Sequence, residues 1–163
     1  MEQTNTTVLT EVKVKKDVYL DLRVKKLLKT ARMPKYAHSG DAGLDLIATS
    51  KSFDKEGNVV YGTGLAFQIP RGYVGLLFPR SSNANQDILL SNSVGVIDSI
   101  YRGEVMFKFK PLKKGWFKKP KTYNIGDKIG QLIVMPYPKV TIREVSELSK
   151  TNRGAGGYGS TGK

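Results

Sequence analysis

The amino-acid sequence predicts an all-β fold, either a sandwich or a barrel, in a single domain. Short apolar runs rich in β-branched and aromatic residues recur along the chain. The 17 glycines and 7 prolines punctuate these runs, at intervals of roughly 8–12 residues that are typical of all-β proteins. A length of 163 residues suits one domain, which buries about two-thirds of the surface exposed by its unfolded chain.

Seven apolar runs are the expected strands. In chain order they are Val12–Leu22, Leu65–Ile69, Tyr73–Phe78, Val94–Ile97, Glu104–Phe109, Lys128–Met135 and Val140–Val145. Short helices are expected only directly after Arg80 and over Leu89–Ser93. A turn and Gly103 separate the fourth run from the fifth, so these two runs are expected to pair as a β-hairpin.

We expect three segments along the chain. Residues 1–20 form a charged N-terminal extension, residues 21–150 form the β domain, and residues 151–163 form a glycine-rich, flexible C-terminal arm. The chain contains neither internal repeats nor heptads. The sequence therefore predicts one compact domain between two loose ends.

The composition excludes several kinds of chemistry. There is no cysteine, which removes thiol catalysis, cysteine-bound zinc, iron–sulfur clusters and a disulfide scaffold. His38 is the one histidine, so a Ser-His-Asp triad has a single candidate base and a histidine-rich metal site is impossible. Hydrophobic residues make up 39% of the chain, which is enough to form a core.

The charge favours an anionic partner. Lysine and arginine number 27 and aspartate and glutamate 14, a net charge of +13. Phosphate, a nucleotide or a nucleic acid would suit this excess, although much of it lies in short lysine runs that could simply be solvated. No apolar run approaches the ~20 residues needed to span a membrane, and the polar segment Met1–Thr10 does not resemble a signal peptide. We therefore expect a soluble, cytoplasmic protein.

Two stretches carry groups suited to phosphate. In Pro79-Arg80-Ser81-Ser82, the guanidinium offers a bidentate fork with two hydroxyls beside it. The alternative is an ordinary surface turn. Gly126-Asp127 marks a turn, after which Gln131 enters an apolar strand, where its amide requires a hydrogen-bond partner.

Two aspartates lie beside apolar segments. Asp98 follows the run Val94–Ile97, at the edge of an apolar wall where a carboxylate could activate a water molecule. Asp45 lies between two leucines in Gly43-Leu44-Asp45-Leu46, and carboxylates are the usual protein ligands of magnesium, often through water. The alternative in each case is a loop aspartate that caps its own backbone.

The C-terminal arm has three interpretations. The spacing of Gly154, Gly156 and Gly159 fits a dinucleotide-binding loop, but the strand and helix around such a loop are missing. A P-loop is excluded in the same way, because the chain ends at Lys163. What remains is either a disordered tail or a flexible arm whose backbone and side chains wrap a phosphate chain.

These stretches together resemble the trimeric dUTP pyrophosphatases (dUTPases), and the resemblance covers roughly residues 22 to 163. The five motifs of that family appear here in order as Ala42-Gly43-Leu44-Asp45-Leu46; Pro79-Arg80-Ser81-Ser82; Gly95-Val96-Ile97-Asp98-Ser99 with Tyr101-Arg102-Gly103; Gly126-Asp127-Lys128-Ile129 with Gln131-Leu132-Ile133; and Arg153-Gly154 with Gly156-Gly157-Tyr158-Gly159-Ser160-Thr161-Gly162.

The resemblance implies a distorted jelly-roll, β-barrel-like subunit in a homotrimer whose three active sites lie between subunits, with the arm of one chain closing over a site built by the other two. The implied reaction is hydrolysis of dUTP to dUMP and pyrophosphate with Mg²⁺. This reaction keeps uracil out of DNA and supplies dUMP for thymidylate synthesis. Nucleic acid is not required, and a regulatory protein partner is possible if the chain is phage-encoded.

Residue roles follow from the same match. Asp98 resembles the catalytic base, and Asp45 the carboxylate that holds magnesium through water. Tyr101 resembles the ring beneath the deoxyribose. The phosphate ligands would be Arg80, Ser81, Ser82, Gln131 and Arg153, joined by Ser160 and Thr161. Asn92, Gly95, Val96 and Ile97 would read uracil, Tyr158 would stack on it, and Gly159 would belong to the closing arm.

The sequence departs from the family pattern at Ile100, Asn83-Ala84-Asn85 and Gly130, and in the long basic segment Lys110–Lys121. Two alternatives remain. The dCTP deaminases resemble this fold, but their catalytic glutamate is replaced here by Lys108. A nucleic-acid-binding protein would also suit the charge and the glycine-rich arm.

Overall fold

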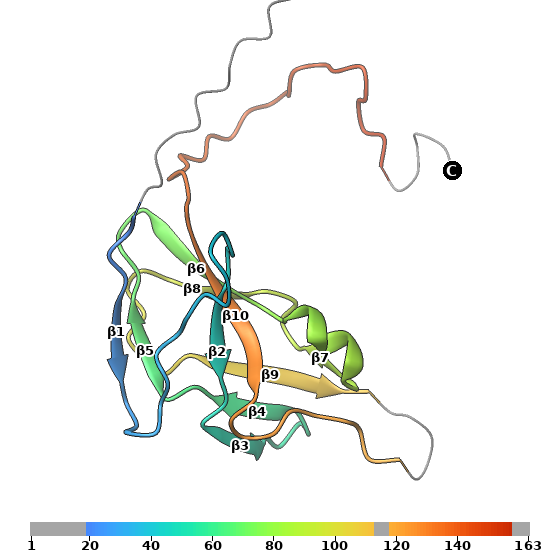
Figure 1. The fold of residues 1–163 in the computed structure, drawn as a ribbon. Helices are drawn as coiled ribbons and strands as arrows, with labels where there is room; N and C mark the ends of the chain where they lie inside the picture. The colour runs from blue at the N-terminus through green and yellow to red at the C-terminus, as the bar shows by residue number, and fades with distance from the viewer. Residues whose placement is uncertain (1–18, 113–117, 158–163) are drawn as a thin grey trace, which may run out of the picture.

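The computed structural model describes residues 19–112 and 118–157. Within them lie ten strands and one 3₁₀ helix, η1 (Figure 1). In chain order the elements are β1 (Arg23–Lys26), β2 (Leu44–Ile47), β3 (Ser50–Phe53), β4 (Val59–Gly62), β5 (Leu65–Gln68), β6 (Tyr73–Phe78), η1 (Ser81–Asn85), β7 (Ile88–Leu90), β8 (Gly95–Ile97), β9 (Met106–Pro111) and β10 (Lys128–Pro136). Across these two ranges, no helix has the length and apolarity that crossing a membrane requires.

The strands form three antiparallel sheets. One four-stranded sheet has the order β2-β10-β6-β8, the other has the order β3-β4-β9-β7, and β1 pairs with β5. The chain therefore moves repeatedly between sheets, as in a jelly roll. This arrangement confirms the predicted all-β, barrel-like fold.

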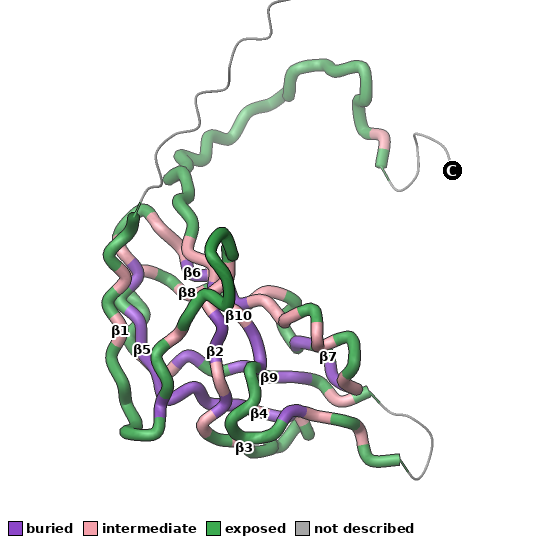
Figure 2. Tube along the Cα trace, in the orientation of Figure 1, coloured by how far each residue is buried: buried purple, intermediate pink, exposed green. Residues whose placement is uncertain are grey.

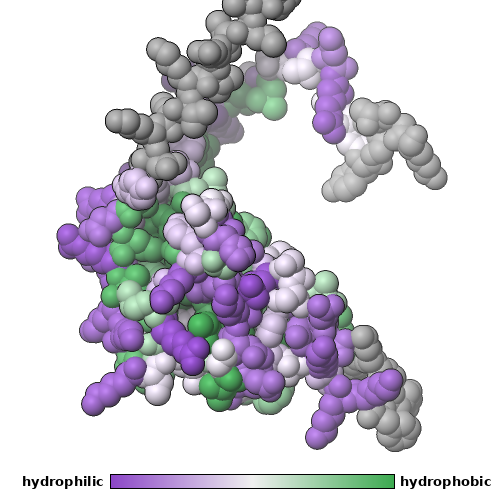
Figure 3. Space-filling model, viewed as in Figure 1, coloured by the Kyte–Doolittle hydropathy of each residue, from purple (hydrophilic) through white to green (hydrophobic). Residues whose placement is uncertain are grey.

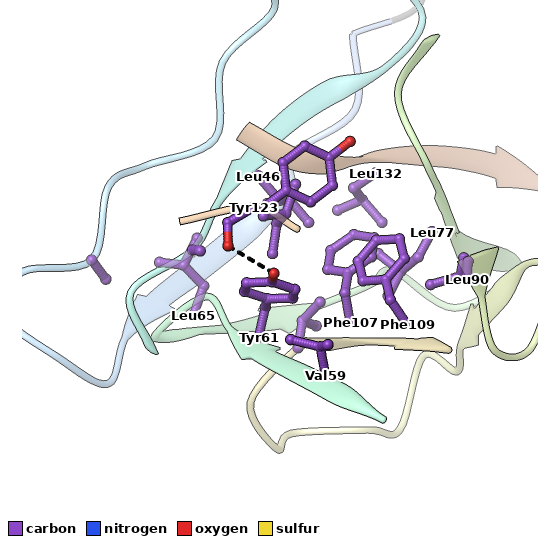
Figure 4. Packing of buried hydrophobic residues seen from close by; sticks show 14 of the residues in the cluster. Leu46, Val59, Tyr61, Leu65, Leu77, Leu90, Phe107, Phe109, Tyr123 and Leu132 are labelled. Atoms are coloured by element: carbon purple, nitrogen blue, oxygen red, sulfur yellow. Dashed lines mark hydrogen bonds between the residues drawn. The ribbon is translucent and has the colours of Figure 1, made fainter. Parts of the chain in front are cut away.

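The core lies between the sheets (Figure 2) and contains a cluster of aromatic rings among aliphatic side chains (Figure 4). Along β9, Phe107 and Phe109 are buried while the alternate residues are exposed, which is the pattern of a strand with one wet face. Tyr61 lies edge-on to Phe109, at 5.9 Å between ring centroids, and its hydroxyl donates to the Tyr123 carbonyl at 2.8 Å. Burial raises the pKa of Tyr61, so the hydroxyl remains a neutral donor.

Most of the predicted elements are present. Leu65–Ile69, Tyr73–Phe78 and Lys128–Met135 correspond to β5, β6 and β10. Val94–Ile97 and Glu104–Phe109 overlap β8 and β9, and the helical turn expected after Arg80 is η1. The first expected strand, Val12–Leu22, lies partly outside the described residues, and its described part precedes β1.

Three expectations are wrong. Leu89–Ser93 is not helical, because Ile88 and Leu90 alternate into the core as part of β7. Val140–Val145 is not a strand, since residues 137–150 extend away from the barrel and the described residues provide no strand beside them to pair with (Figure 1). The hairpin between the fourth and fifth runs is absent, because β8 pairs with β6 whereas β9 pairs with β4 and β7.

Gly130 is explained by the core beneath it. A Cβ atom at this position would overlap the ring of Phe107, which is 1% exposed. A glycine on β10 therefore makes room for a large ring on β9. The departure from the family pattern at Gly130 is a packing adjustment between two sheets.

We predict that Gly130→Ala lowers the free energy of unfolding by about 1–3 kcal/mol, the usual cost of overpacking a core. Urea denaturation should measure the loss, with Gly157→Ala as the control, because a Cβ at Gly157 meets no atom within 4 Å. Adding Phe107→Leu to Gly130→Ala should recover part of the loss. Equal stability of the Gly130→Ala and Gly157→Ala proteins would contradict this account.

Candidate active site

The candidate site is built on three neighbouring strands, β2, β10 and β6. Their register places Asp45 opposite Gln131, and Gln131 opposite Phe78. The adjacent row, Leu44, Leu132 and Leu77, faces the core, so the Asp45 row points to the other side of the sheet. Arg80 lies two residues beyond the end of β6, after Pro79, and its side chain reaches back to Asp45.

Asp45 is the electrostatic centre of this region. It is 9% exposed, and its Oδ1 accepts a hydrogen bond from Arg80 Nε at 2.8 Å. Lys128 Nζ lies 2.7 Å from Oδ2, but without the angles of a hydrogen bond, so Oδ2 lacks a hydrogen-bond donor among the described residues. Two cations therefore compensate one buried carboxylate, as an ionised group at this depth requires.

Gln131 has the hydrogen-bond partner that its amide was expected to need on an apolar strand. Its Nε2 donates to the Pro79 carbonyl at 3.1 Å, which joins β10 to the turn that carries Arg80. Gly43 is needed beside it, since a Cβ there would overlap the Gln131 amide. The conformations of the first, second and fourth motifs therefore depend on one another.

The turn after β6 is stabilised by Asn83, one of the departures from the family pattern. Its backbone N–H donates to the Arg80 carbonyl at 2.9 Å, and its side-chain amide donates to the Ile88 carbonyl at 3.0 Å. Arg80 Nη1 also donates a long hydrogen bond of 3.4 Å to Ser82 Oγ. The Ser81 side chain remains exposed beside the guanidinium.

These groups line a cleft of about 280 Å³. Its walls include Asp41, Asp45, Arg80, Ser81 and Gln131. The two carboxylates offset the cations around them, so the described cleft alone lacks the positive charge that a nucleoside triphosphate requires.

The cleft also fits a magnesium ion held mainly by water and phosphate. Magnesium in phosphoryl-transfer sites usually takes only one or two protein carboxylates. Asp45 and Asp41 both line this cleft, and Asp45 Oδ2 has Lys128 Nζ 2.7 Å away but no hydrogen bond of good geometry. Among the described residues, no three histidines, cysteines, aspartates or glutamates cluster into a protein-only metal cage.

A second, smaller pocket of about 170 Å³ lies between the β7–β8 loop and β9. Its lining comprises Leu77, Leu90, Ser91, Asn92, Gly95, Met106 and Lys108. Asn92 and Gly95 were expected to contact the base, and both line this pocket. Val96 and Ile97 were expected beside them but are not part of the lining.

Asp98 lies away from the cleft in the single chain. Ile97 pairs with Gly75, and Arg80 lies five residues beyond Gly75, or about 16 Å at roughly 3.3 Å per residue. The Asp98 side chain is exposed and makes neither a hydrogen bond nor an ion pair within the described ranges. Its carboxylate is therefore free to act on a molecule that arrives from outside.

Tyr101 and Arg102 shape the turn that follows Asp98. The Tyr101 hydroxyl donates to the Glu104 carbonyl at 3.0 Å, and its ring lies against Gly103, where a Cβ would overlap it. Arg102 Nη1 donates to the carbonyls of Ser99 and Tyr101, at 2.7 Å each. Sequence reasoning gave Arg102 no separate role, since no local pattern indicates that its guanidinium would bond to the backbone of its own turn.

The described part of the arm, residues 151–157, is not folded onto the cleft (Figure 1). Arg153 Nε donates to the Gly156 carbonyl at 2.9 Å, within a local turn. Tyr158, Gly159, Ser160 and Thr161, the other arm residues expected at the site, lie outside the described residues. Of the expected site residues, the structure therefore brings Asp45, Arg80, Ser81, Ser82 and Gln131 together and places Asn92 and Gly95 at a separate pocket.

Fold and cleft define a class of protein: an antiparallel, jelly-roll-like β protein with a polar cleft suited to phosphate groups. A model of the dUTPase family matches residues 29–162. The deoxyuridine 5'-triphosphate nucleotidohydrolase of Corynebacterium glutamicum is 41% identical over 144 residues, which cover 87% of this chain and 95% of that protein. Its counterpart in Clostridium acetobutylicum is 40% identical over 145 residues, with 88% and 97% covered. The chain belongs to the dUTPase family.

Solved structures agree with this assignment. A mutant dUTPase of Staphylococcus bacteriophage 80alpha, with dUpNHpp, is 29% identical and has a TM-score of 0.73, with 88% of this chain and 99% of that chain covered. A mutant dUTPase from phage phi11 of S. aureus, described with a structural Mg(II) ion, is 28% identical and has a TM-score of 0.66, with 78% and 98% covered.

We predict that Lys128→Met destabilises the protein through Asp45. Removing one cation leaves the buried carboxylate with Arg80 alone, at a cost of about 1 kcal/mol after allowing for solvent screening at half-exposed Lys128. Urea denaturation measures the effect, and Lys110→Met, which removes an exposed lysine on β9, is the matched control. If both substitutions have the same effect, Lys128 does not stabilise Asp45.

Proposed function

We propose that this protein hydrolyses dUTP to dUMP and pyrophosphate, with Mg²⁺. The observation that carries this proposal is the convergence of Asp45, Gln131 and Arg80 from three motifs on one polar cleft. Membership of the dUTPase family and relatives at about 40% identity support the choice of substrate. Pyrophosphate release from dUTP, dCTP, dTTP and UTP, assayed side by side, tests it.

The cleft would bind the phosphates. Arg80 presents its remaining guanidinium N–H groups, while Ser81 and Ser82 present hydroxyls and Gln131 its amide. Asp45 would hold magnesium through water, and the bound metal would neutralise negative charge on the phosphate chain. Arg153, and Ser160 and Thr161 of the arm, would add the phosphate ligands that the cleft lacks.

The chemical step requires one positioned base. Asp98 would orient a water molecule and accept its proton while the water oxygen bonds to the α-phosphorus. The bond from that phosphorus to the bridging oxygen breaks, and pyrophosphate leaves with the bonding electrons. Positioned base catalysis contributes about 10²–10⁴-fold, so charge neutralisation in the cleft must supply much of the remaining acceleration.

The nucleoside would lie in the smaller pocket. Asn92 and the backbone from Gly95 to Ile97 would read uracil, Tyr101 would pack beneath the deoxyribose, and Tyr158 would stack on the base. Tyr101 is 41% exposed and its hydroxyl is held by a hydrogen bond, so its ring can present a flat surface to a sugar. Gly159 would let the arm approach closely.

We propose a homotrimer in which each site uses more than one chain. The distance along β6 between the cleft and Asp98 supports this assembly, since one chain does not bring the base to its own phosphates. Exposed apolar side chains beyond β10 give further support: Val140 is 75%, Ile142 91% and Leu148 86% exposed. An apolar strip lies beside β1 (Figure 3), where Leu22, Val24 and Val134 line a cavity of about 1140 Å³.

The segment boundaries at residues 20 and 150 remain a proposal, as does the closing arm. A regulatory partner also remains a prediction. Phage dUTPases among the structural relatives are described as controlling the transfer of virulence genes, but the described residues of this chain favour only the nucleotide reaction. Lys108 on β9, in place of a glutamate, argues against deamination.

We predict that Asp98→Asn cuts turnover at least about a hundredfold while leaving nucleotide binding nearly unchanged, because an amide cannot accept the proton. The comparison is between kcat for dUTP and the affinity for a non-hydrolysable dUTP analogue, with thermal unfolding as the control for folding. Turnover within a few-fold of the unaltered protein would remove Asp98 from the mechanism.

We predict that two inactive variants restore activity when co-expressed. One is Asp98→Asn, and the other lacks residues 151–163. If Asp98 and the arm reach each site from different chains, about a quarter of the sites in randomly mixed trimers contain both. Pyrophosphate release from the purified mixture measures the rescue, with each variant alone as its control. A mixture as inactive as its components would place both elements on the same chain.

A further inference from the structure

Lys108 is the one charged residue in the lining of the small pocket. It points outward from β9, next to buried Phe107 and Phe109, and its side chain is 52% exposed. The remaining lining is apolar or uncharged, and includes Leu77, Leu90 and Met106. The Lys108 ammonium, which is paired with Asp54 just outside the lining, carries donors and no acceptor.

A closed ring of contacts holds this lysine. Lys108 Nζ lies 3.1 Å from Asp54 Oδ2. Asn58 donates to both Asp54 oxygens, from its amide at 3.0 Å and its backbone N–H at 2.8 Å. Ser91 Oγ makes a long contact of 3.5 Å with Asn58 Oδ1, and the Ser91 N–H donates to the Lys108 carbonyl at 2.9 Å.

The ring joins the β3–β4 turn to the loop that carries Asn92. Hydrogen bonding by the Asn58 side chain, with contributions from its backbone N–H and Lys108, lowers the pKa of Asp54 to about 2 against the opposing effect of burial. Asp54 is therefore ionised at ordinary pH, and its contact with the Lys108 ammonium is an ion pair. That contact occupies one of the three ammonium hydrogens and leaves two for a ligand.

We propose that Lys108 is a specificity-determining residue of the base pocket, where its ammonium group favours a pyrimidine with a carbonyl over one with an exocyclic amine. The inference rests on the proposed function, which places the base in this pocket. A carbonyl oxygen accepts a hydrogen bond from the ammonium, whereas an amine would bring two donors face to face. Sites built to hydrogen-bond a substrate group discriminate strongly against analogues that lack it. Asp54 is a positioning residue in this scheme.

Binding of dUMP and dCMP by calorimetry tests the proposal directly. The key variant is Lys108→Met, which keeps the length of the side chain and removes its donors. Lys110→Met is the matched control, since Lys110 is the next exposed lysine on β9 and is not part of the pocket lining. Loss of a hydrogen bond from a charged group should weaken dUMP binding about 10- to 100-fold. Binding of dCMP should stay level or improve.

Asp54→Asn should change the ratio of dUMP to dCMP affinity in the same direction but by less, because it frees Lys108 without removing it. Lys108→Arg should restore part of the preference for dUMP. If Lys108 had a purely structural role, Lys108→Met would instead weaken the binding of both ligands equally and lower the melting temperature. An unchanged ratio in Lys108→Met, or equal weakening of both ligands, would overturn the proposal.

The two hypotheses can fail separately. If dUTP releases no pyrophosphate but Lys108→Met still abolishes the preference for dUMP, the proposed reaction is wrong and the base pocket stands. If dUTP is hydrolysed and the preference survives Lys108→Met, the reaction stands and the role of Lys108 is wrong.

Discussion

A single buried carboxylate determines how the candidate site is assembled. Asp45 on β2 is costly to bury as an ion unless cations lie beside it. Those cations come from the end of β6 and the start of β10, so distant parts of the sequence must meet in one register. The irregularity between Lys128 and Gly130 makes this possible, since it lets Lys128 reach Asp45 while Gln131 lies directly opposite. The same register brings the proposed phosphate-binding groups to one cleft.

Strands with an apolar sequence could be predicted. Strands that form only because a neighbouring strand pairs with them could not. β5, β6 and β10 are mainly apolar runs with clear ends. β3, with the sequence Ser-Lys-Ser-Phe, has no such signal and exists because it pairs with β4. Val140–Val145 shows the converse, a sequence with strand propensity that has no partner within the described residues. Propensity and pairing are separate requirements, and a sequence displays only the first.

The motifs predicted which residues converge on the cleft, but they did not predict the residues that support it. Asp45, Arg80 and Gln131 were identified by residue type and order, whereas the contact of Lys128 with Asp45 depends on a register that no local pattern reveals. Gly130 was noted as a departure, and its cause lies across the core in Phe107. Asn83 was likewise noted as a departure, yet it holds the turn that carries Arg80.

The division of the site has a chemical consequence. One chain carries the proposed phosphate cleft at one end of β6 and the proposed base toward the other. The carboxylate of that base is exposed and has no partner among the described residues. The described cleft is also short of positive charge, which magnesium and Arg153 would supply. A lone subunit would therefore hold phosphates weakly and without a base beside them. Assembly would bring a base to the phosphates. Ordering the cationic arm costs roughly 1–2 kcal/mol per residue, and contacts with a full triphosphate would offset that cost. Hydrolysis would then depend on both assembly and the full triphosphate, which protects the product from further attack.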